Sequence, residues 1–252
     1  PWTEKPRKWL FEFIGKSKVP IMNSAGGTEV SGSILHCCLH RPFKVGSFNA
    51  PIPGMSADIL TLDGKKVSTD EMGELVIRKS SIGLTKSLWN DDDRYIKNYW
   101  SIIKDFWVHG DLASKDKDGH WFLHGRSDDT IKVSGKRIGP SELESVIVKS
   151  GKAKEVAAVG IPDENKGSKI ILSIVLLENS EEKVSYFENL VINDLGKSFK
   201  PDKIIFVKDL PKTRNMKIMR RVIKSCLAKE DPGDISTLLN PESVEEIRAH
   251  AI

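Results

Sequence analysis

The 252-residue chain is 39% hydrophobic and 29% charged, a balance typical of folded globular proteins that excludes a disordered or fibrous one. Its longest apolar run, residues 170–177, is far shorter than the roughly 20 residues of a membrane-spanning helix, so we expect a soluble protein with no membrane segment. The net charge is only +4, and no recognition motif accompanies the basic residues between Lys197 and Arg221, so nucleic-acid binding is the least favoured function.

The cysteines and the first residues of the sequence indicate the cell compartment and whether the sequence belongs to a larger architecture. Cys37, Cys38 and Cys226 have neither the spacing of a disulfide framework nor that of a zinc site, and no secretion signal leads the sequence, so we expect a cytoplasmic protein. Residue 1 is not Met, and apolar residues that include Trp2 and Trp9 follow at once. We therefore expect the sequence to begin inside a larger architecture.

The first half predicts a small β-rich region. Residues 18–22 form a short apolar piece, and the small residues 23–27 predict a turn after it. Asp63-Gly64 separates two apolar runs and predicts a hairpin within a β subdomain that covers residues 33–78. Beyond this region the sequence predicts a helix over 91–103, a strand over 106–108, and a second hairpin at Asp118-Gly119 that leads into residues 120–123.

The second half predicts alternating strands and helices, which is typical of a compact α+β unit. Pro140 suits the first turn of a helix that should end near Ser150. The elements expected after it are strands over 155–161 and 170–177, a helix over 185–195, a strand over 203–207 and a helix over 219–227.

Four motifs then occur in a fixed order: Ser24-Ala25-Gly26-Gly27-Thr28-Glu29, His109-Gly110-Asp111, the run from Gly125 to Arg137, and Pro211-Lys212-Thr213-Arg214-Asn215-Met216-Lys217-Ile218-Met219-Arg220-Arg221. With them the chain resembles the adenylate-forming superfamily, and most closely its AMP-forming acetyl-CoA synthetases. The resemblance implies an α+β protein. Residues 1–127 would be the C-terminal part of the large AMP-binding domain, including a small β-barrel-like subdomain, and residues 128–252 a mobile C-terminal domain.

The resemblance also implies a site for ATP or AMP with Mg²⁺. Gly27 and Thr28 correspond to nucleotide-binding positions, with the Thr28 hydroxyl on the α-phosphate, and Glu29 to the residue that helps hold the metal ion. Asp111 corresponds to the ribose-binding aspartate, because a carboxylate can accept hydrogen bonds from both ribose hydroxyls. A lone Thr-Glu pair would be better explained as a surface turn, so the order of the four motifs is what favours this assignment.

The remaining assignments fall mostly in the second half. Arg126 and Arg137 match basic residues that contact the ribose and phosphate, and Asp128 matches the hinge about which the C-terminal domain turns. Ser134-Gly135 matches the turn along which the pantetheine arm of CoA passes. Lys217 matches the catalytic lysine that bridges the substrate carboxylate and the α-phosphate.

The chain departs from the family pattern in three places. No Ser/Thr/Gly-rich phosphate loop precedes Thr28, so we expect little adenylation without a complementing N-terminal chain. Ala25 and Gly26 stand where acetyl-CoA synthetases carry tryptophans that close the acyl pocket, which predicts a deeper pocket and tolerance of acyl chains longer than acetate. Asn215-Met216 replaces Ser-Gly, which predicts a stiffer lysine loop.

The function implied is that of an acyl-CoA synthetase. A small carboxylic acid and ATP give acyl-AMP and pyrophosphate, and CoA then gives acyl-CoA and AMP. The family arginine that helps hold the CoA phosphates has no counterpart near Ile192, so fewer residues support CoA as acceptor than support adenylate formation. The alternative is a non-catalytic nucleotide-binding or regulatory remnant of the same fold.

Overall fold

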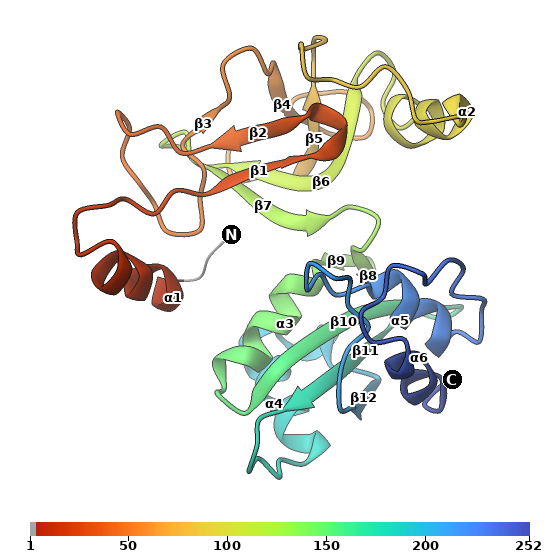
Figure 1. Cartoon of the computed structure of the whole chain (residues 1–252). Helices are drawn as coiled ribbons and strands as arrows, with labels where there is room; N and C mark the ends of the chain where they lie inside the picture. Colours follow the sequence, from red (N-terminus) through yellow and green to blue (C-terminus); the bar gives the residue numbers. More distant parts are fainter. Residues whose placement is uncertain (1–3) are drawn as a thin grey trace. The chain divides into compact units, whose positions relative to one another are not determined.

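The computed structural model describes residues 4–252, so Trp2 lies outside the described residues. The chain forms two compact units, Pro1–Ser127 and Asp128–Ile252 (Figure 1). Each unit has apolar cores of its own. The fold class is α+β, as expected. The functional roles and the mobility that the family resemblance gives to the two parts stay predictions.

Unit 1 is built on two antiparallel sheets that share a core around Phe48, Leu75 and the fully buried Trp107. The first sheet has the order β1-β2-β3, and the second the order β4-β5-β6-β7. The strands are β1 (Ser24–Gly27), β2 (Gly32–His36), β3 (Ala50–Pro51), β4 (Ala57–Leu60), β5 (Gly73–Ile77), β6 (Trp107–Lys115) and β7 (Trp121–Arg126).

The predicted turn over residues 23–27 is wrong, because Ser24–Gly27 is strand β1. It pairs with β2, and the register shifts between Ala25 and Gly26. A Cβ built on Gly26 would lie 2.0 Å from the carbonyl oxygen of Gly32, so glycine is needed here for close strand contact and not for a turn. The hairpin predicted at Asp63-Gly64 is partly confirmed. Strands β4 and β5 are antiparallel neighbours, as expected. The Asp63-Gly64 turn, however, brings residues 60 and 66 together in an isolated bridge, and further residues follow before β5 begins.

Short helices complete unit 1. The helix predicted over 91–103 is confirmed as α2 (Asp92–Tyr95), which continues into the π-helical turn η3 (Ile96–Trp100). At the start of the chain, α1 (Glu4–Trp9) and η1 (Leu10–Ile14) form a helical segment in which no residue is buried. The sequence did not predict this segment as helical.

Unit 2 has three layers, with a mixed sheet of the order β10-β11-β12 between two pairs of helices (Figure 1). Strand β11 is antiparallel to β10 and parallel to β12. The elements are β8 (Ile131–Val133), β9 (Lys136–Ile138), α3 (Pro140–Lys149), β10 (Ala153–Asp163), β11 (Gly167–Leu176), α4 (Val184–Leu195), η4 (Lys197–Phe199), β12 (Lys203–Phe206), α5 (Arg220–Leu227) and α6 (Glu242–Arg248).

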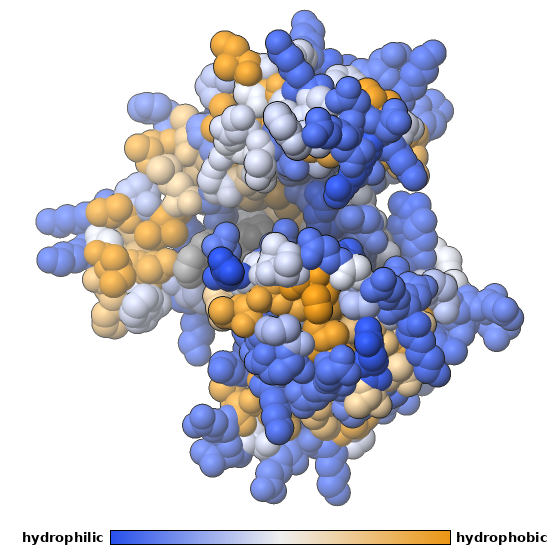
Figure 2. Space-filling model, turned by 45° about the vertical axis from the view of Figure 1, so that its right-hand side comes forward, coloured by the Kyte–Doolittle hydropathy of each residue, from blue (hydrophilic) through white to orange (hydrophobic). Residues whose placement is uncertain are grey.

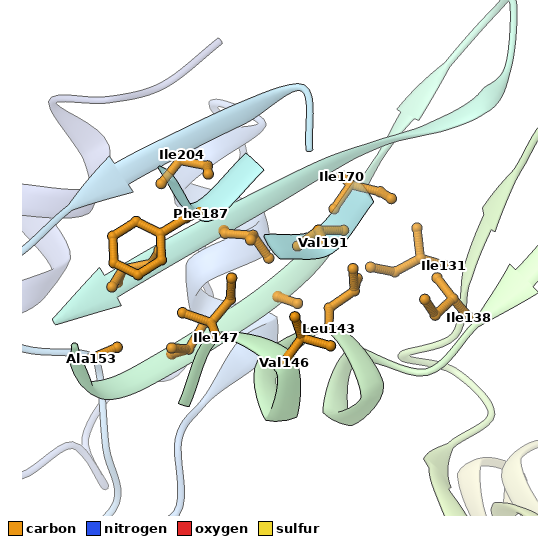
Figure 3. Packing of buried hydrophobic residues seen from close by; sticks show 14 of the residues in the cluster. Ile131, Ile138, Leu143, Val146, Ile147, Ala153, Ile170, Phe187, Val191 and Ile204 are labelled. Carbon is orange, nitrogen blue, oxygen red and sulfur yellow. The ribbon is translucent and has the colours of Figure 1, made fainter. Parts of the chain in front are cut away.

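The period of two along the strands explains the layers, because successive side chains point to opposite faces of a sheet. In β10, Val156 and Ala158 join the core under α3 and α4, whereas Ala157 and Val159 join the core under α5 and α6. Figure 3 shows the first of these cores, to which α3 contributes Leu143, Val146 and Ile147 and α4 contributes Phe187 and Val191.

The predicted elements of the second half are confirmed; β10 and β11 are longer than expected, and β12 is one residue shorter. Only three residues connect β10 to β11, because Asp163 and Gly167 still pair. Helix α6 was not predicted. None of the helices in residues 4–252 has the length and apolar character needed to cross a bilayer.

Candidate nucleotide site

The Thr-Glu motif follows β1 directly. Thr28 and Glu29 lie in η2 (Thr28–Val30), a single 3₁₀ turn that ends at Ser31 in the left-handed conformation (φ 53°). The backbone oxygen of Glu29 accepts a hydrogen bond from Thr85 N at 2.7 Å, and its side-chain Oε1 accepts one from the Tyr99 hydroxyl at 3.0 Å. The motif is therefore fixed by its backbone and by one carboxylate oxygen, while the Thr28 side chain is exposed.

Asp111 and Arg126 are brought together by the register of a hairpin. Strands β6 and β7 are antiparallel, and Asp111 is the direct cross-strand partner of Arg126. The Arg126 Nη1 lies 3.6 Å from Asp111 Oδ1 and donates a hydrogen bond to the backbone oxygen of His109 at 2.9 Å. A carboxylate acceptor and a guanidinium donor thus lie side by side at one end of the β6–β7 pair.

His109 joins the Thr-Glu motif to this pair. Its Nε2 lies 3.3 Å from Asp111 Oδ2, and the residue is 7% exposed. A Cβ built on Gly27 would lie 3.2 Å from His109 Cε1 and 3.1 Å from Glu29 Oε2, so these three residues are close neighbours. The structure therefore brings together Gly27, Glu29, Asp111 and Arg126 of the predicted site.

Two further members of this cluster, Tyr99 and His109, were given no role by the sequence analysis. His109 is the first residue of the His109-Gly110-Asp111 motif, but nothing in a single sequence shows that its ring faces Asp111. Burial raises the pKa of Tyr99, and the hydrogen bond to Glu29 raises it further, so the hydroxyl keeps its proton and acts as a donor.

The residues present fit a nucleotide with its metal ion. The Asp111 side chain is 18% exposed and offers acceptor oxygens to ribose hydroxyls. The Glu29 carboxylate is a hard oxygen donor of the kind that Mg²⁺ takes once or twice from a protein, with phosphates and water completing its shell. The Arg126 side chain is 44% exposed, which leaves its donors accessible to a phosphate or ribose.

The predicted residues of unit 2 lie on its surface. Ser134 and Gly135 form the tight turn between β8 and β9, both with positive φ (49° and 80°), and a Cβ on Gly135 would meet nothing within 4 Å. Arg137 is exposed on β9 beside that turn. Asp128 is the first residue of the unit and lies in an exposed turn.

Lys217 lies in a loop whose base is closed by backbone hydrogen bonds. Lys212 and Ile218 form an isolated bridge, and Thr213 N donates to Lys217 O at 2.9 Å. Met216 adopts the left-handed conformation (φ 61°), which a residue other than glycine adopts at a cost. The Lys217 side chain is exposed.

The other lysine of this loop anchors it. Lys212 is 5% exposed, and its Nζ lies 2.7 Å from Glu155 Oε2 and 2.6 Å from Asp209 Oδ1. Burial lowers the pKa of Lys212, but the hydrogen bonds to Asp209 and Glu155 outweigh it and raise that pKa overall. Sequence reasoning missed this contrast between a buried, paired lysine and an exposed one five residues later.

A second ion pair fixes the end of the motif. Arg220, at the start of α5, donates from Nε and Nη2 to the two carboxylate oxygens of Glu144 on α3, at 2.9 and 2.7 Å. Glu144 Oε1 also accepts from Ala158 N at 2.9 Å. This bidentate ion pair connects α5 to α3, and the Ala158 hydrogen bond connects both to β10. The exposed part of the motif is therefore the loop before Arg220.

Ala25 and Gly26, the predicted acyl-pocket residues, lie on β1. Ala25 packs against the core of unit 1, and Gly26 stands against β2 as described above. Asp116, Asp118 and His120 could each offer a metal ligand atom, all within 4.8 Å of one another. Both Asp116 oxygens are already engaged, by the Asp118 and His120 amides and by Lys44, so this cluster is explained by the β6–β7 turn.

Sequence comparison finds similar proteins over almost the whole chain. Residues 142–217 match the AMP-binding enzyme C-terminal domain. The chain is 38% identical over 246 residues to the acetyl-coenzyme A synthetase of Methanothrix thermoacetophila, which covers 95% of this chain and 37% of that protein. For the acetyl-coenzyme A synthetase of Pasteurella multocida the identity is 38% over 252 residues, covering 95% and 38%. The chain thus spans less than two-fifths of these relatives.

Solved structures show the same fold. Acetoacetyl-CoA synthetase from Streptomyces lividans matches 99% of this chain and 39% of its own, with a TM-score of 0.86 and 22% identity. ATP-bound MatB from Rhodopseudomonas palustris matches 87% of this chain and 43% of its own, with a TM-score of 0.74 and 21% identity. Over 95% of its length the chain is similar to the C-terminal part of acetyl-CoA synthetases, and its residues 142–217 match the AMP-binding enzyme C-terminal domain.

Proposed function

We propose that this chain supplies the ribose-binding and lysine-bearing parts of an AMP-forming acyl-CoA synthetase. A carboxylate oxygen of a small carboxylic acid attacks the α-phosphorus of ATP, and pyrophosphate leaves to give acyl-AMP. The thiol of CoA then attacks the acyl carbon, and AMP leaves. The observation that carries the proposal is the cluster of Glu29, Asp111 and Arg126 held in one place by β1, β6 and β7.

Each residue has a defined part in this proposal. Asp111 accepts hydrogen bonds from the ribose, and Arg126 donates to the nucleotide. Glu29 would help hold Mg²⁺, which would supply positive charge to the phosphates. Lys217 brings its cationic amine to the carboxylate and α-phosphate oxygens, where negative charges must approach one another. Asp128 serves as hinge, Arg137 contacts the nucleotide, and Ser134-Gly135 lines the path of CoA.

We further propose that a complementing N-terminal polypeptide supplies the phosphate loop. The chain spans 37% of the Methanothrix relative, and no Ser/Thr/Gly-rich loop precedes Thr28. Apolar side chains reach the surface among polar ones (Figure 2). In unit 1, Trp9, Phe13 and Ile14 are 52 to 67% exposed and Trp89 is 92% exposed, as expected of residues that further polypeptide covers. Cytoplasmic reactions with ATP and CoA agree with the free state of all three cysteines.

Nucleotide binding is the first test. Isothermal titration of the chain with AMP should show binding, and Asp111→Asn should weaken it about 10- to 100-fold, since a hydrogen bond to a charged group contributes roughly 1.5–3 kcal/mol. Asp118→Asn, in the exposed β6–β7 turn, is the matched control and should leave the affinity unchanged. No AMP binding by the wild-type chain would contradict the proposal.

Catalysis is the second test. The chain alone should show no carboxylate-dependent ATP–pyrophosphate exchange, whereas joining it to the N-terminal part of the Pasteurella multocida relative should restore exchange. In that chimera, Lys217→Ala should abolish exchange and leave thioester formation from supplied acyl-AMP intact. AMP binding without exchange in the chimera would instead favour a non-catalytic, regulatory module.

A further inference from the structure

A row of aromatic rings in unit 1 connects the two carboxylates of the candidate site. The Tyr99 ring, from η3, stacks on Trp107 of β6 with centroids 5.1 Å apart and an angle of 3° between planes. Trp107 in turn contacts His109, two residues along β6, with centroids 5.6 Å apart and an angle of 33°. The three rings thus form one continuous row from η3 along the face of β6.

Each end of the row meets a carboxylate. The Tyr99 hydroxyl donates to Glu29 Oε1 at 3.0 Å, and His109 Nε2 lies 3.3 Å from Asp111 Oδ2. Glu29 is the proposed metal-binding residue, and Asp111 is the proposed ribose-binding residue. The row therefore joins the part of the site that meets phosphate and metal to the part that meets ribose.

The middle of the row is buried. Trp107 is 0% exposed and belongs to the core that holds both sheets of unit 1 together. Residues 107 and 109 lie on the same face of β6, because side chains alternate along a strand. A close-packed core restricts the position of a buried ring, so the Trp107 ring keeps the two polar ends of the row apart.

The contacts made by Tyr99 and His109 leave the carboxylates of Glu29 and Asp111 able to accept further hydrogen bonds. Each oxygen of an ionised carboxylate accepts about two hydrogen bonds. Asp111 faces His109 with Oδ2 and Arg126 with Oδ1, so lone pairs of both oxygens remain for ribose hydroxyls. Glu29 accepts the Tyr99 hydroxyl with Oε1, and its Oε2 lies beside Gly27, 3.1 Å from a Cβ built there.

We propose that Tyr99 and His109 are positioning residues for nucleotide binding. His109 orients the Asp111 carboxylate toward the ribose, Tyr99 orients the Glu29 carboxylate toward the metal ion, and Trp107 sets the spacing between them. This inference rests on the proposed function. Neither Tyr99 nor His109 touches the nucleotide, so each acts through its carboxylate, and each is tested through the ligand group that its carboxylate binds.

The His109 test compares AMP with 2′,3′-dideoxy-AMP, which lacks both ribose hydroxyls. With the full chain, His109→Leu should weaken AMP binding about tenfold and leave binding of the dideoxy nucleotide unchanged. His109→Gln, which keeps a donor near the Nε2 position, should retain most of the AMP affinity. In an Asp111→Asn background, His109→Leu should cost nothing further, because the carboxylate it orients is gone.

The Tyr99 test uses Mg²⁺. Tyr99→Phe keeps the stacked ring and removes the hydroxyl, so it should leave AMP affinity unchanged and reduce several-fold the gain in ATP affinity that Mg²⁺ provides. Equal losses for AMP and ATP, with and without Mg²⁺, would show a general structural effect and overturn this half of the inference.

A measurement without nucleotide tests the contact between His109 and Asp111 directly, so that its loss can be distinguished from a folding defect. In histidine labelled with ¹⁵N, Asp111→Asn should shift the Nε2 resonance of the His109 ring and leave those of the other five histidines in place. An unshifted ring, or equal losses of AMP and dideoxy-AMP affinity in His109→Leu, overturns the inference while the proposed function stands. Failure of the wild-type chain to bind AMP overturns both.

Discussion

Gly110 shows how one residue without a side chain makes room for the site. It lies between His109 and Asp111 with φ 82°, and a Cβ built on it would come within 2.7 Å of Arg126 Nη2. Its backbone oxygen also accepts a hydrogen bond from Ser127 N at 2.9 Å. The glycine is therefore needed for conformation and for space, and the guanidinium of Arg126 lies over its backbone.

Gly110→Ala should lower both stability and nucleotide affinity. A left-handed conformation costs a residue with a Cβ about 1–2 kcal/mol, and the new methyl group also displaces Arg126. Gly54→Ala is the matched control, since Gly54 has φ 86° and nothing within 4 Å of its Cβ position. It should lose similar stability in urea unfolding without a change in AMP affinity. Equal AMP affinities for the two variants would show that Arg126 accommodates the methyl group.

At the scale of elements, the two lysines of the loop over residues 211–217 have different environments. Lys212 is buried at its base between Glu155 and Asp209, while Lys217 is exposed after a left-handed Met216. Met216 stands where the family pattern has glycine, and its positive φ agrees with the prediction of a stiffer loop, which stays a prediction. The same residue type thus stabilises the fold at one end of the loop and is free to meet a ligand at the other.

Lys212→Met should destabilise the protein far more than Lys217→Met. Removing the buried ammonium leaves two carboxylates without their cation, which costs 3–5 kcal/mol in a fully buried pair. The Asp209 side chain is 45% exposed, so we expect a smaller loss of about 2 kcal/mol. Lys217→Met should change the free energy of unfolding by less than about 0.5 kcal/mol. Urea unfolding followed by circular dichroism measures both, and similar losses would contradict the anchoring role.

At the scale of the whole molecule, the two units have separate cores. The apolar clusters of unit 1 draw on residues 25–123, and those of unit 2 on residues 131–247. All six tryptophans fall within residues 1–127, so indole fluorescence reports on unit 1 alone. This distribution provides a direct test of whether the units unfold independently.

Leu143→Ala should destabilise unit 2 selectively. Leu143 is 0% exposed in the core beneath α3, and truncating a buried leucine costs about 2–5 kcal/mol. The transition seen by circular dichroism should acquire an earlier phase, while the tryptophan transition should keep its midpoint. A parallel shift of both signals would show that the two units unfold as one cooperative body.

The sequence by itself determined the motifs, the fold class and most elements of the second half. The reason is local: alternation of apolar residues, Pro140 at a helix start and the Asp-Gly pairs act over a few residues. It failed at Gly26, where the cause was non-local: Gly26 belongs to a strand because β2 lies against it. Helix α6 was missed although Pro241 and Glu242 stand at its start and Arg248 lies in its last turn.

Only the tertiary structure decided which side chains meet. The register of β6 with β7 places Asp111 opposite Arg126, and the packing of η3 on β6 brings Tyr99 to Glu29, 70 residues away. It also decided that Lys212 is buried and Lys217 is not. Register, ring packing and burial depend on residues distant in the chain, so they follow from the assembled sheets and not from local pattern.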